Sequence, residues 1–298
     1  MHILTAYDDS PYSRFALDGL SKLPHRGEID LSLVTVSTVP SMADWFGTTQ
    51  ANDATQFIKP QREADEKRMQ EIADSVAASF RSIRTHLPSG SPGVEIVKLG
   101  KSEKVDLIVC GAIGRSALSR VFLGSVSDYV STSAECSVLV IRPPAVTTGK
   151  PLPEPVGPRR VLVGVGNAQS DGRLTEWIAR LQLPPDAEVD LVYVMEKRPE
   201  YELGLLRQAA VYWDELRSTA SGHIKTMSEK LSAAGHRVQS ELVDAPHIGA
   251  ALVEHAAKRE CDLIIVGDRR ETIVARMLLG STSRHVLRQA PCSVLIAR

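Results

Sequence analysis

One segment of this chain occurs twice. The segment 106–142 aligns without a gap to 262–298, and 16 of the 37 aligned positions are identical. Each copy has the order apolar run, glycine turn, short helical stretch, Gly-Ser, helical stretch, apolar run. A chain of 298 residues is long enough for two domains of roughly 140 residues, each with its own core. The repeat therefore predicts two tandem domains of one architecture, 1–142 and 159–298.

The stretch between the predicted domains is rich in proline. Residues 143–158 contain six prolines, at positions 143, 144, 151, 153, 155 and 158. Proline removes a backbone donor and stiffens the chain, so this stretch is predicted to be an extended linker.

Apolar strand patterns alternate with helical patterns in both halves. The predicted strands are 3–7, 31–36, 94–99, 106–110 and 137–141 in the first half, and 161–165, 189–195, 238–243, 262–266 and 293–297 in the second. Ser10 and Pro11 suit the cap and first position of a helix, and long helices are predicted over 58–84 and 203–234. Alternation of this kind predicts an α/β fold with a doubly wound parallel sheet in each half.

One connection of the first half is unexpectedly short. Only six positions lead from Gly100 to Asp106, whereas 18 lead from Asp244 to Asp262, including a helical stretch over 248–258. A parallel crossover normally needs a dozen or more residues. Either this crossover is unusual or residues are missing from the sequence near Gly100.

Three spaced glycines carry the chemistry of the first copy. Gly111, Gly114 and Gly124-Ser125 follow the pattern G-x2-G-x9-G-S, with the last pair at the start of a helix. Glycines allow backbone N–H groups to approach an anion, and a helix N-terminus favours a phosphate. Asp8 follows the first strand, and Gly111 follows the fourth. In a doubly wound sheet these two strand ends flank the crevice where ligands bind, so the pattern favours a nucleotide site.

The chain resembles the universal stress protein family in its tandem form. The resemblance rests on ILTAYDDS, DLIVCGAIGRSALSRVFLGSVSDYV and CSVLVIR, and it extends over both halves. It implies a Rossmann-like fold of the adenine nucleotide alpha hydrolase kind, with strand order 3-2-1-4-5 in each half, and ATP with its divalent ion, Mg²⁺, as ligand. It also implies pairing of the two domains through their fifth strands, and a dimer or other homo-oligomer. The residues that it assigns to the nucleotide are Ala6, Asp8, Val36, Cys110, Gly111, Gly114, Gly124, Ser125 and Val126.

The second half departs from this pattern. Gly166 stands where the first half has Asp8, and Arg270 stands in the place of Gly114. A long side chain there would crowd the approach of phosphates, although a guanidinium can also attract them. We expect the second site to be degenerate.

Composition excludes several other classes of function. The formal net charge is −1, no basic tract suggests nucleic acid, and no apolar run approaches the length of a membrane span. The four cysteines form no CxxC pair, and the eight histidines have no metal-ligand spacing. A reduced, cytoplasmic protein fits best. Trp45 and Phe46 either cover the nucleotide or fill a loop.

The sequence thus favours an ATP-binding stress-response regulator that acts through its conformation or through a protein partner. Two alternatives stay open: a weak ATP-hydrolysing or nucleotidyl-transferring enzyme of the same fold, and a scaffold that binds no nucleotide. We predict no catalytic residue, because no base is placed beside Ser125 by the sequence.

Overall fold

The computed structural model describes residues 1–23, 26–37, 51–113, 123–144, 152–166, 168–196, 206–268 and 279–298. For 51–59, 168–170 and 206–212 it describes the backbone only. The chain divides into two compact units, Met1–Val156 and Gly157–Arg298.

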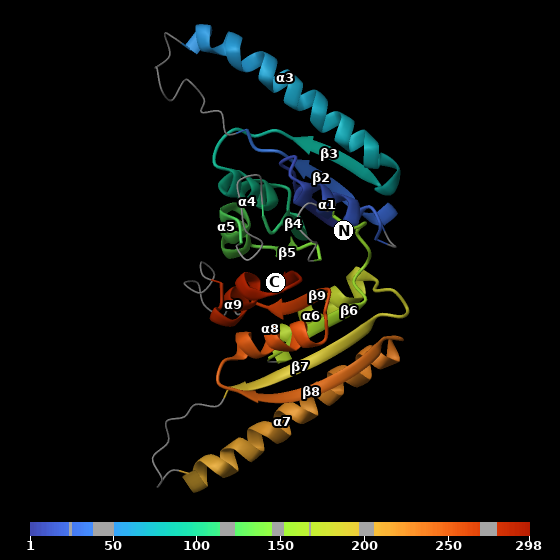
Figure 1. The fold of residues 1–298 in the computed structure, drawn as a ribbon, viewed down its shortest axis with the longest axis vertical. Helices are drawn as coiled ribbons and strands as arrows, with labels where there is room; N and C mark the ends of the chain where they lie inside the picture. The colour runs from blue at the N-terminus through green and yellow to red at the C-terminus, as the bar shows by residue number, and fades with distance from the viewer. Residues whose placement is uncertain are drawn as a thin grey trace. The chain divides into compact units, whose positions relative to one another are not determined.

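The first unit is a parallel sheet with helices between its strands (Figure 1). Its strands are β1 (His2–Ala6), β2 (Asp30–Val34), β3 (Ser82–His86), β4 (Leu107–Gly111) and β5 (Ser137–Ile141). Its described helices are α1 (Pro11–Leu20), α3 (Ala51–Val76), α4 (Pro92–Ser102) and α5 (Ser125–Ser133), with short 3-10 turns η1 (Arg26–Glu28) and η2 (Ala77–Ser79). The strand order β3-β2-β1-β4-β5 confirms the predicted 3-2-1-4-5 sheet.

The second unit repeats this plan with the order β8-β7-β6-β9-β10. Its strands are β6 (Arg160–Val165), β7 (Glu188–Glu196), β8 (Arg237–Ala245), β9 (Leu263–Gly267) and β10 (Ser293–Ala297). Its described helices are α6 (Ala168–Leu181), α7 (Leu206–Ala233), α8 (Ile248–Lys258) and α9 (Ser281–Gln289).

The predicted third strand of the first unit is wrong. Residues 94–99 lie in α4, which begins with Ser91 at its cap position and Pro92 in its first turn. The third strand is instead β3, a short and largely exposed segment that overlaps the end of the long helix predicted over 58–84. The sequence of β3 has no alternation of apolar and polar residues, which would have indicated a strand. Its one apolar residue, Ile83, falls at helical spacing from the buried residues of α3, and this favoured a longer helix.

This correction also removes the short crossover. Helix α4 itself connects β3 to β4, as α8 connects β8 to β9. Gly93 precedes Asp106 by the same 13 positions that separate Gly249 from Asp262. No residues are missing from this connection, and the expectation of an unusual or incomplete crossover is wrong.

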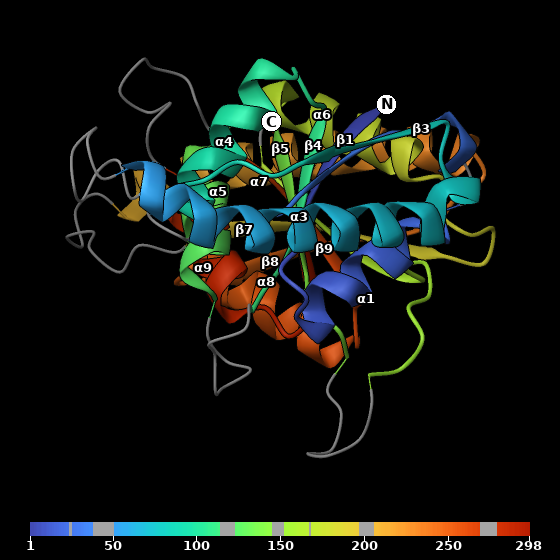
Figure 2. The ribbon, with the colours of Figure 1, turned by 90° about the horizontal axis from the view of Figure 1, so that it is seen from above.

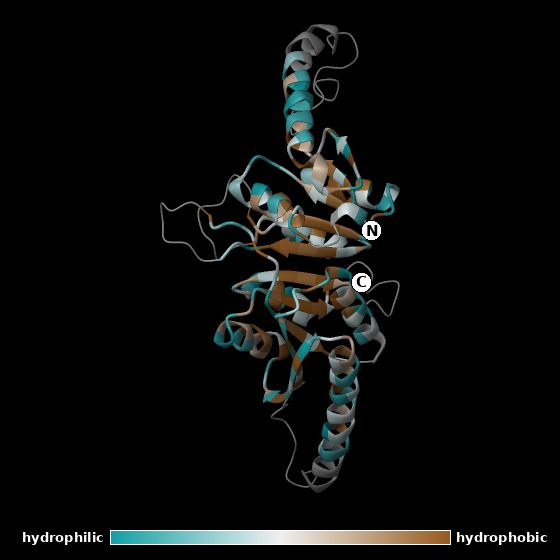
Figure 3. Cartoon of the chain, turned by 90° about the vertical axis from the view of Figure 1, so that its right-hand side faces the viewer, coloured by the Kyte–Doolittle hydropathy of each residue, from teal (hydrophilic) through white to brown (hydrophobic). Residues whose placement is uncertain are grey.

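The core of each sheet follows from the apolar runs of its inner strands. Ile3 of β1 pairs in register with Leu31 of β2 and Leu107 of β4, and the three side chains are almost completely buried. Figure 3 shows these inner strands as hydrophobic and the described part of the long helix α3 as largely hydrophilic. Strands covered by helices on both faces require such continuous apolar runs.

The winding of the sheet reverses between β1 and β4. The chain runs from β1 outward through β2 to β3, and then returns to β4 and β5 on the other side of β1. Figure 2 shows α1 and α4 on opposite sides of the strands. A crevice therefore opens at the carboxyl ends of β1 and β4, where the two directions separate.

Candidate functional site

The start of helix α5 provides open backbone donors at this crevice. Gly124 occupies the cap position with an extended backbone, and no side chain caps the helix. The Gly124 N–H donates to the Ala112 carbonyl at 2.7 Å, and the buried Ser127 hydroxyl donates to the Gly111 carbonyl at 2.6 Å. These bonds hold the helix start against the end of β4. The first-turn N–H groups that follow are the usual ligands of a bound anion.

Asp8 lies across the crevice, in the turn between β1 and α1. Its carboxylate accepts from the Ser10 N–H at 3.1 Å, and its own N–H donates to the Ser13 hydroxyl at 3.3 Å. Ser10 caps α1 as predicted, because its side chain accepts from the Ser13 N–H. Asp9 has a φ of 60°, a left-handed conformation that a short polar residue tolerates. The turn that presents Asp8 is thus held by its own hydrogen bonds.

A cavity of about 310 Å³, called here the cleft, joins these two features. It brings together eight of the nine predicted site residues: Ala6, Asp8, Val36, Cys110, Gly111, Gly124, Ser125 and Val126. Gly114, Arg270, Trp45 and Phe46 lie outside the described residues.

Sequence reasoning missed other residues of the cleft. Pro92 and Ile96 of α4 line it, as do Ser10, Ser13 and Thr35. Ile96 was missed because residues 94–99 were predicted to form a strand, whereas they lie in α4. Ser10 and Ser13 had a signal, since a capping serine at the turn after β1 must lie beside Asp8.

Gly111 and Cys110 make the wall of the cleft narrow and uncharged. A Cβ at Gly111 would lie 3.0 Å from the Tyr12 Cβ and 3.3 Å from the Tyr12 backbone carbon, so glycine allows β4 to end against α1. Burial raises the pKa of the Cys110 thiol to about 12, although a hydrogen bond with Ser127 opposes the shift. The thiol is therefore neutral at physiological pH and is not an active nucleophile.

The corresponding corner of the second unit carries a carboxylate at another position. Gly166 follows β6 in place of Asp8, and its N–H donates to the Asp171 carboxylate at 3.1 Å. Asp171 lies five residues after Gly166, as Ser13 lies five residues after Asp8. Its side chain is buried and is hydrogen-bonded to His223 of α7. The second unit thus places a buried acidic group where the first has a small hydroxyl.

A second buried carboxylate lies behind the helix start of the second unit. Asp268 forms an ion pair with Arg298 at 2.9 Å, with both side chains almost fully buried. Its other oxygen lies 3.5 Å from the Gly280 N–H, at the cap of α9. Ala112 occupies this position in the first unit, so the first unit has no acidic side chain there.

Neither a metal cluster nor a membrane helix is found in the described part of the chain. No group of three or more His, Cys, Asp or Glu side chains among the described residues could hold a metal ion. No described helix is long and apolar enough to span a membrane.

Comparison with known proteins provides evidence on the family and the fold of this chain. The model of the Universal stress protein family matches residues 1–142 and again 157–298. A relative from Staphylococcus haemolyticus is 34% identical over 145 residues, 47% of this chain and 84% of that protein. A universal stress protein of Mycobacterium tuberculosis is 28% identical over 221 residues, 73% of this chain and 69% of that protein. The crystal structure of a universal stress protein from Archaeoglobus fulgidus matches with a TM-score of 0.64 at 21% identity, covering 100% of this chain and 96% of that chain.

Proposed function

The chain belongs to the universal stress protein family, and we propose that its first unit binds ATP and regulates a stress response through the occupancy of that site. The observation that carries this proposal is the cleft, which joins the open start of α5 to the carboxylate of Asp8. Gly111, Gly124 and the capped turn after β1, far apart in the sequence, thereby face a single cavity of ligand size.

The phosphates fit the α5 end of the cleft. Gly124 has no Cβ and Ser125 has an exposed side chain, so an anion can reach the first-turn N–H groups. The Ser125 hydroxyl adds a further donor. A divalent ion bound with ATP would neutralise phosphate charge.

The nucleoside fits the β1 end of the cleft. The Asp8 carboxylate is an acceptor that suits the hydroxyls of a ribose. Ala6, Val34 and Val36 supply apolar surface beside it, against which the nucleoside can pack.

Occupancy of the cleft can be transmitted to the long helix α3. Asp9, the neighbour of Asp8, forms an ion pair with Arg68 on that helix. A ligand that changes the Asp8 turn changes this tether as well. The regulatory output is therefore proposed to be a change in the position or stability of α3 that a protein partner reads.

The second unit is proposed to bind ATP far more weakly. Gly166 removes the carboxylate of Asp8, and Asp171 adds a buried negative charge at the position of Ser13. The first change deletes the proposed acceptor for the ribose, and the second adds a carboxylate that opposes a polyanionic ligand. Pairing of the two units through β5 and β10 stays a prediction of the family resemblance.

Titration calorimetry of the full chain with ATP and Mg²⁺ tests the proposal. We expect one ATP per chain, and loss of that binding in Gly114→Arg, which copies Arg270 into the first unit. A folded protein that binds no ATP at millimolar concentration contradicts the proposal, and two sites of similar affinity contradict the assignment of the second unit. ATP turnover that disappears in the same variant would instead favour the enzymatic alternative.

A further inference from the structure

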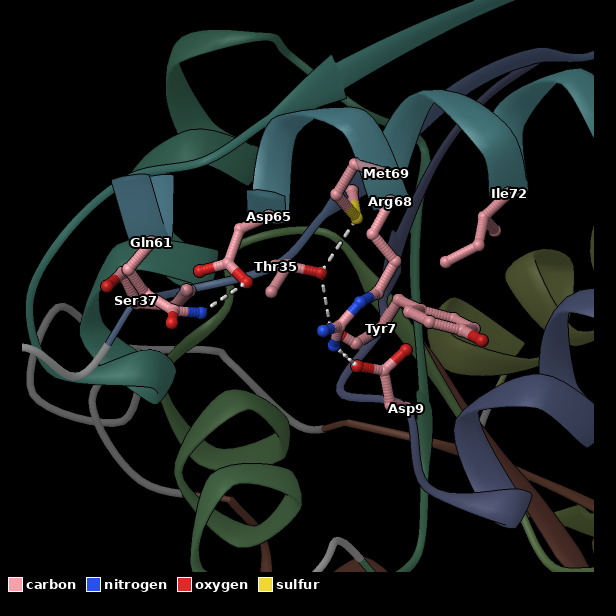
Figure 4. Close-up of a pocket in the computed structure, with 10 residues that line it drawn as sticks. Tyr7, Asp9, Thr35, Ser37, Gln61, Asp65, Arg68, Met69 and Ile72 are labelled. Atoms are coloured by element: carbon pink, nitrogen blue, oxygen red, sulfur yellow. Dashed lines mark hydrogen bonds and ion pairs between the residues drawn. The ribbon is translucent and has the colours of Figure 1, made fainter. Parts of the chain in front are cut away.

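A second cavity of about 300 Å³, called here the side cavity, lies next to the cleft (Figure 4). Tyr7, Thr35 and Val36 line both cavities, so the two meet at the ends of β1 and β2. The far wall of the side cavity is one face of α3. Phosphates at the start of α5 would occupy the opposite end of the cleft, so a nucleotide bound in this direction brings its base toward the side cavity.

The floor of the side cavity is apolar and contains sulfur. Met69 and Ile72 of α3 are buried there together with Tyr7. The Thr35 hydroxyl lies 2.7 Å from the Tyr7 carbonyl and 2.9 Å from the Met69 sulfur, which holds these groups in place. A flat aromatic base can stack on such a surface, and methionine sulfur makes favourable contacts with aromatic rings.

The rim of the side cavity carries two aspartates with different hydrogen-bond partners. Asp9 is paired with the guanidinium of Arg68, which compensates its charge. Asp65 instead accepts from the neutral side-chain amide of Gln61, at 3.0 Å between Gln61 Nε2 and Asp65 Oδ1. Figure 4 shows Gln61 and Asp65 side by side on the cavity wall. A carboxylate accepts hydrogen bonds and cannot donate them, so this wall suits a ligand group that donates.

We propose that the side cavity receives the base of the nucleotide and that Asp65, oriented by Gln61, determines specificity for the exocyclic amino group of adenine. The inference rests on the proposed function. The amino group donates to the carboxylate. Inosine carries a carbonyl oxygen at the same place, and two acceptors that face each other repel.

The same helix offers a matched control for Asp65. Asp74 accepts from Gln70 Nε2 at 2.8 Å, with the same four-residue spacing, and its residue is exposed. It does not line the side cavity. Asp74→Asn therefore removes the same charge from α3 without changing the proposed contact.

The experiment compares ATP with inosine triphosphate on the full chain by calorimetry. Wild type and Asp74→Asn are expected to prefer ATP by about tenfold, the effect of one hydrogen bond to a charged group. Asp65→Asn is expected to lose this preference, because an amide can donate to the inosine oxygen. Tripolyphosphate, which has no base, is expected to compete equally in all three proteins.

Each possible result has one meaning. An equal affinity of wild type for the two nucleotides, or an unchanged preference in Asp65→Asn, overturns the role of Asp65 and leaves the ATP site standing. Equal weakening of ATP, inosine triphosphate and tripolyphosphate in Asp65→Asn also overturns it, since the residue would then act on the whole site. Failure of wild type to bind any of the three overturns the proposed function itself.

Discussion

The turn after the first strand differs between the two units, although the surrounding fold is the same. In the first unit the turn carries Asp8, and the next residue, Asp9, is tethered to Arg68 of α3. In the second unit the turn carries Gly166, and the tether runs from Asp171 to His223 of α7. The duplicated architecture thus keeps a link between its long helix and its first turn. The two units differ in where the carboxylate at this corner is placed. In the first unit it is Asp8, at the crevice, and in the second it is Asp171, buried in the first turn of α6.

The largest effect on ATP affinity is expected from placing a carboxylate in the first unit at the position that Asp171 has in the second. Ser13→Asp places a negative charge in the cleft beside Asp8, and like charges there oppose phosphate and each other. We expect the ATP affinity to fall by about a hundredfold, measured by calorimetry. Ser13→Ala removes the hydroxyl without adding charge and should retain most of the binding. Equal losses in the two variants would mean that the hydroxyl, and not the charge, matters.

A smaller effect is expected from removing the first unit's own carboxylate. Asp8→Gly copies Gly166 and deletes the acceptor for the ribose, so we expect about a tenfold loss of ATP affinity. Asp8→Asn keeps an oxygen for the Ser10 N–H and is expected to lose less. Unchanged affinity in Asp8→Gly would show that the aspartate is not a nucleotide contact.

The tether should become pH-dependent when its cation is exchanged. Arg68→His gives α3 the residue that α7 has in His223, and an imidazole of ordinary pKa is charged at pH 5.5 and neutral at pH 8. The Asp9 pair would then form at pH 5.5 and be lost at pH 8. We expect amide exchange in α3 to be about two- to threefold faster at pH 8 than at pH 5.5, after correction for the intrinsic pH dependence of exchange. A wild-type protein with the same corrected pH dependence would argue against the tether.

The smallest effect is expected from alkylation of Cys110, at the position where the second unit has Val266. With its pKa raised to about 12 by burial, only about one thiol in ten thousand is ionised at pH 8. Alkylation with iodoacetamide at pH 8 should leave Cys110 unmodified in the folded protein and modify it in urea, as read by peptide mass spectrometry. Rapid modification of the folded protein would show that the cleft opens to reagent.

Much of the fold could be predicted because each copy of the duplicated segment contains the fourth and fifth strands of its unit. The runs ending each copy, 137–141 and 293–297, coincide with β5 and β10. Strand β3 could not be predicted in this way. It is stabilised by pairing with β2 at the border of the sheet and leaves most of its side chains exposed, so its sequence carries no apolar period.

The candidate site, like the fold, was predicted from the sequence only in part. The amino-acid sequence by itself determined the duplication, the α/β class, and the residues of the first cleft that follow a strand or begin a helix, among them Asp8, Gly111 and Gly124. Those positions are set by local rules of capping and backbone freedom, which are readable along the chain. Only the tertiary structure decided that Ile96 of α4 lines the cleft, that Asp171 replaces the hydroxyl of Ser13, and that Asp65 of α3 lines the side cavity. These contacts join segments distant in sequence, and packing of helices on the sheet determines which of their residues meet.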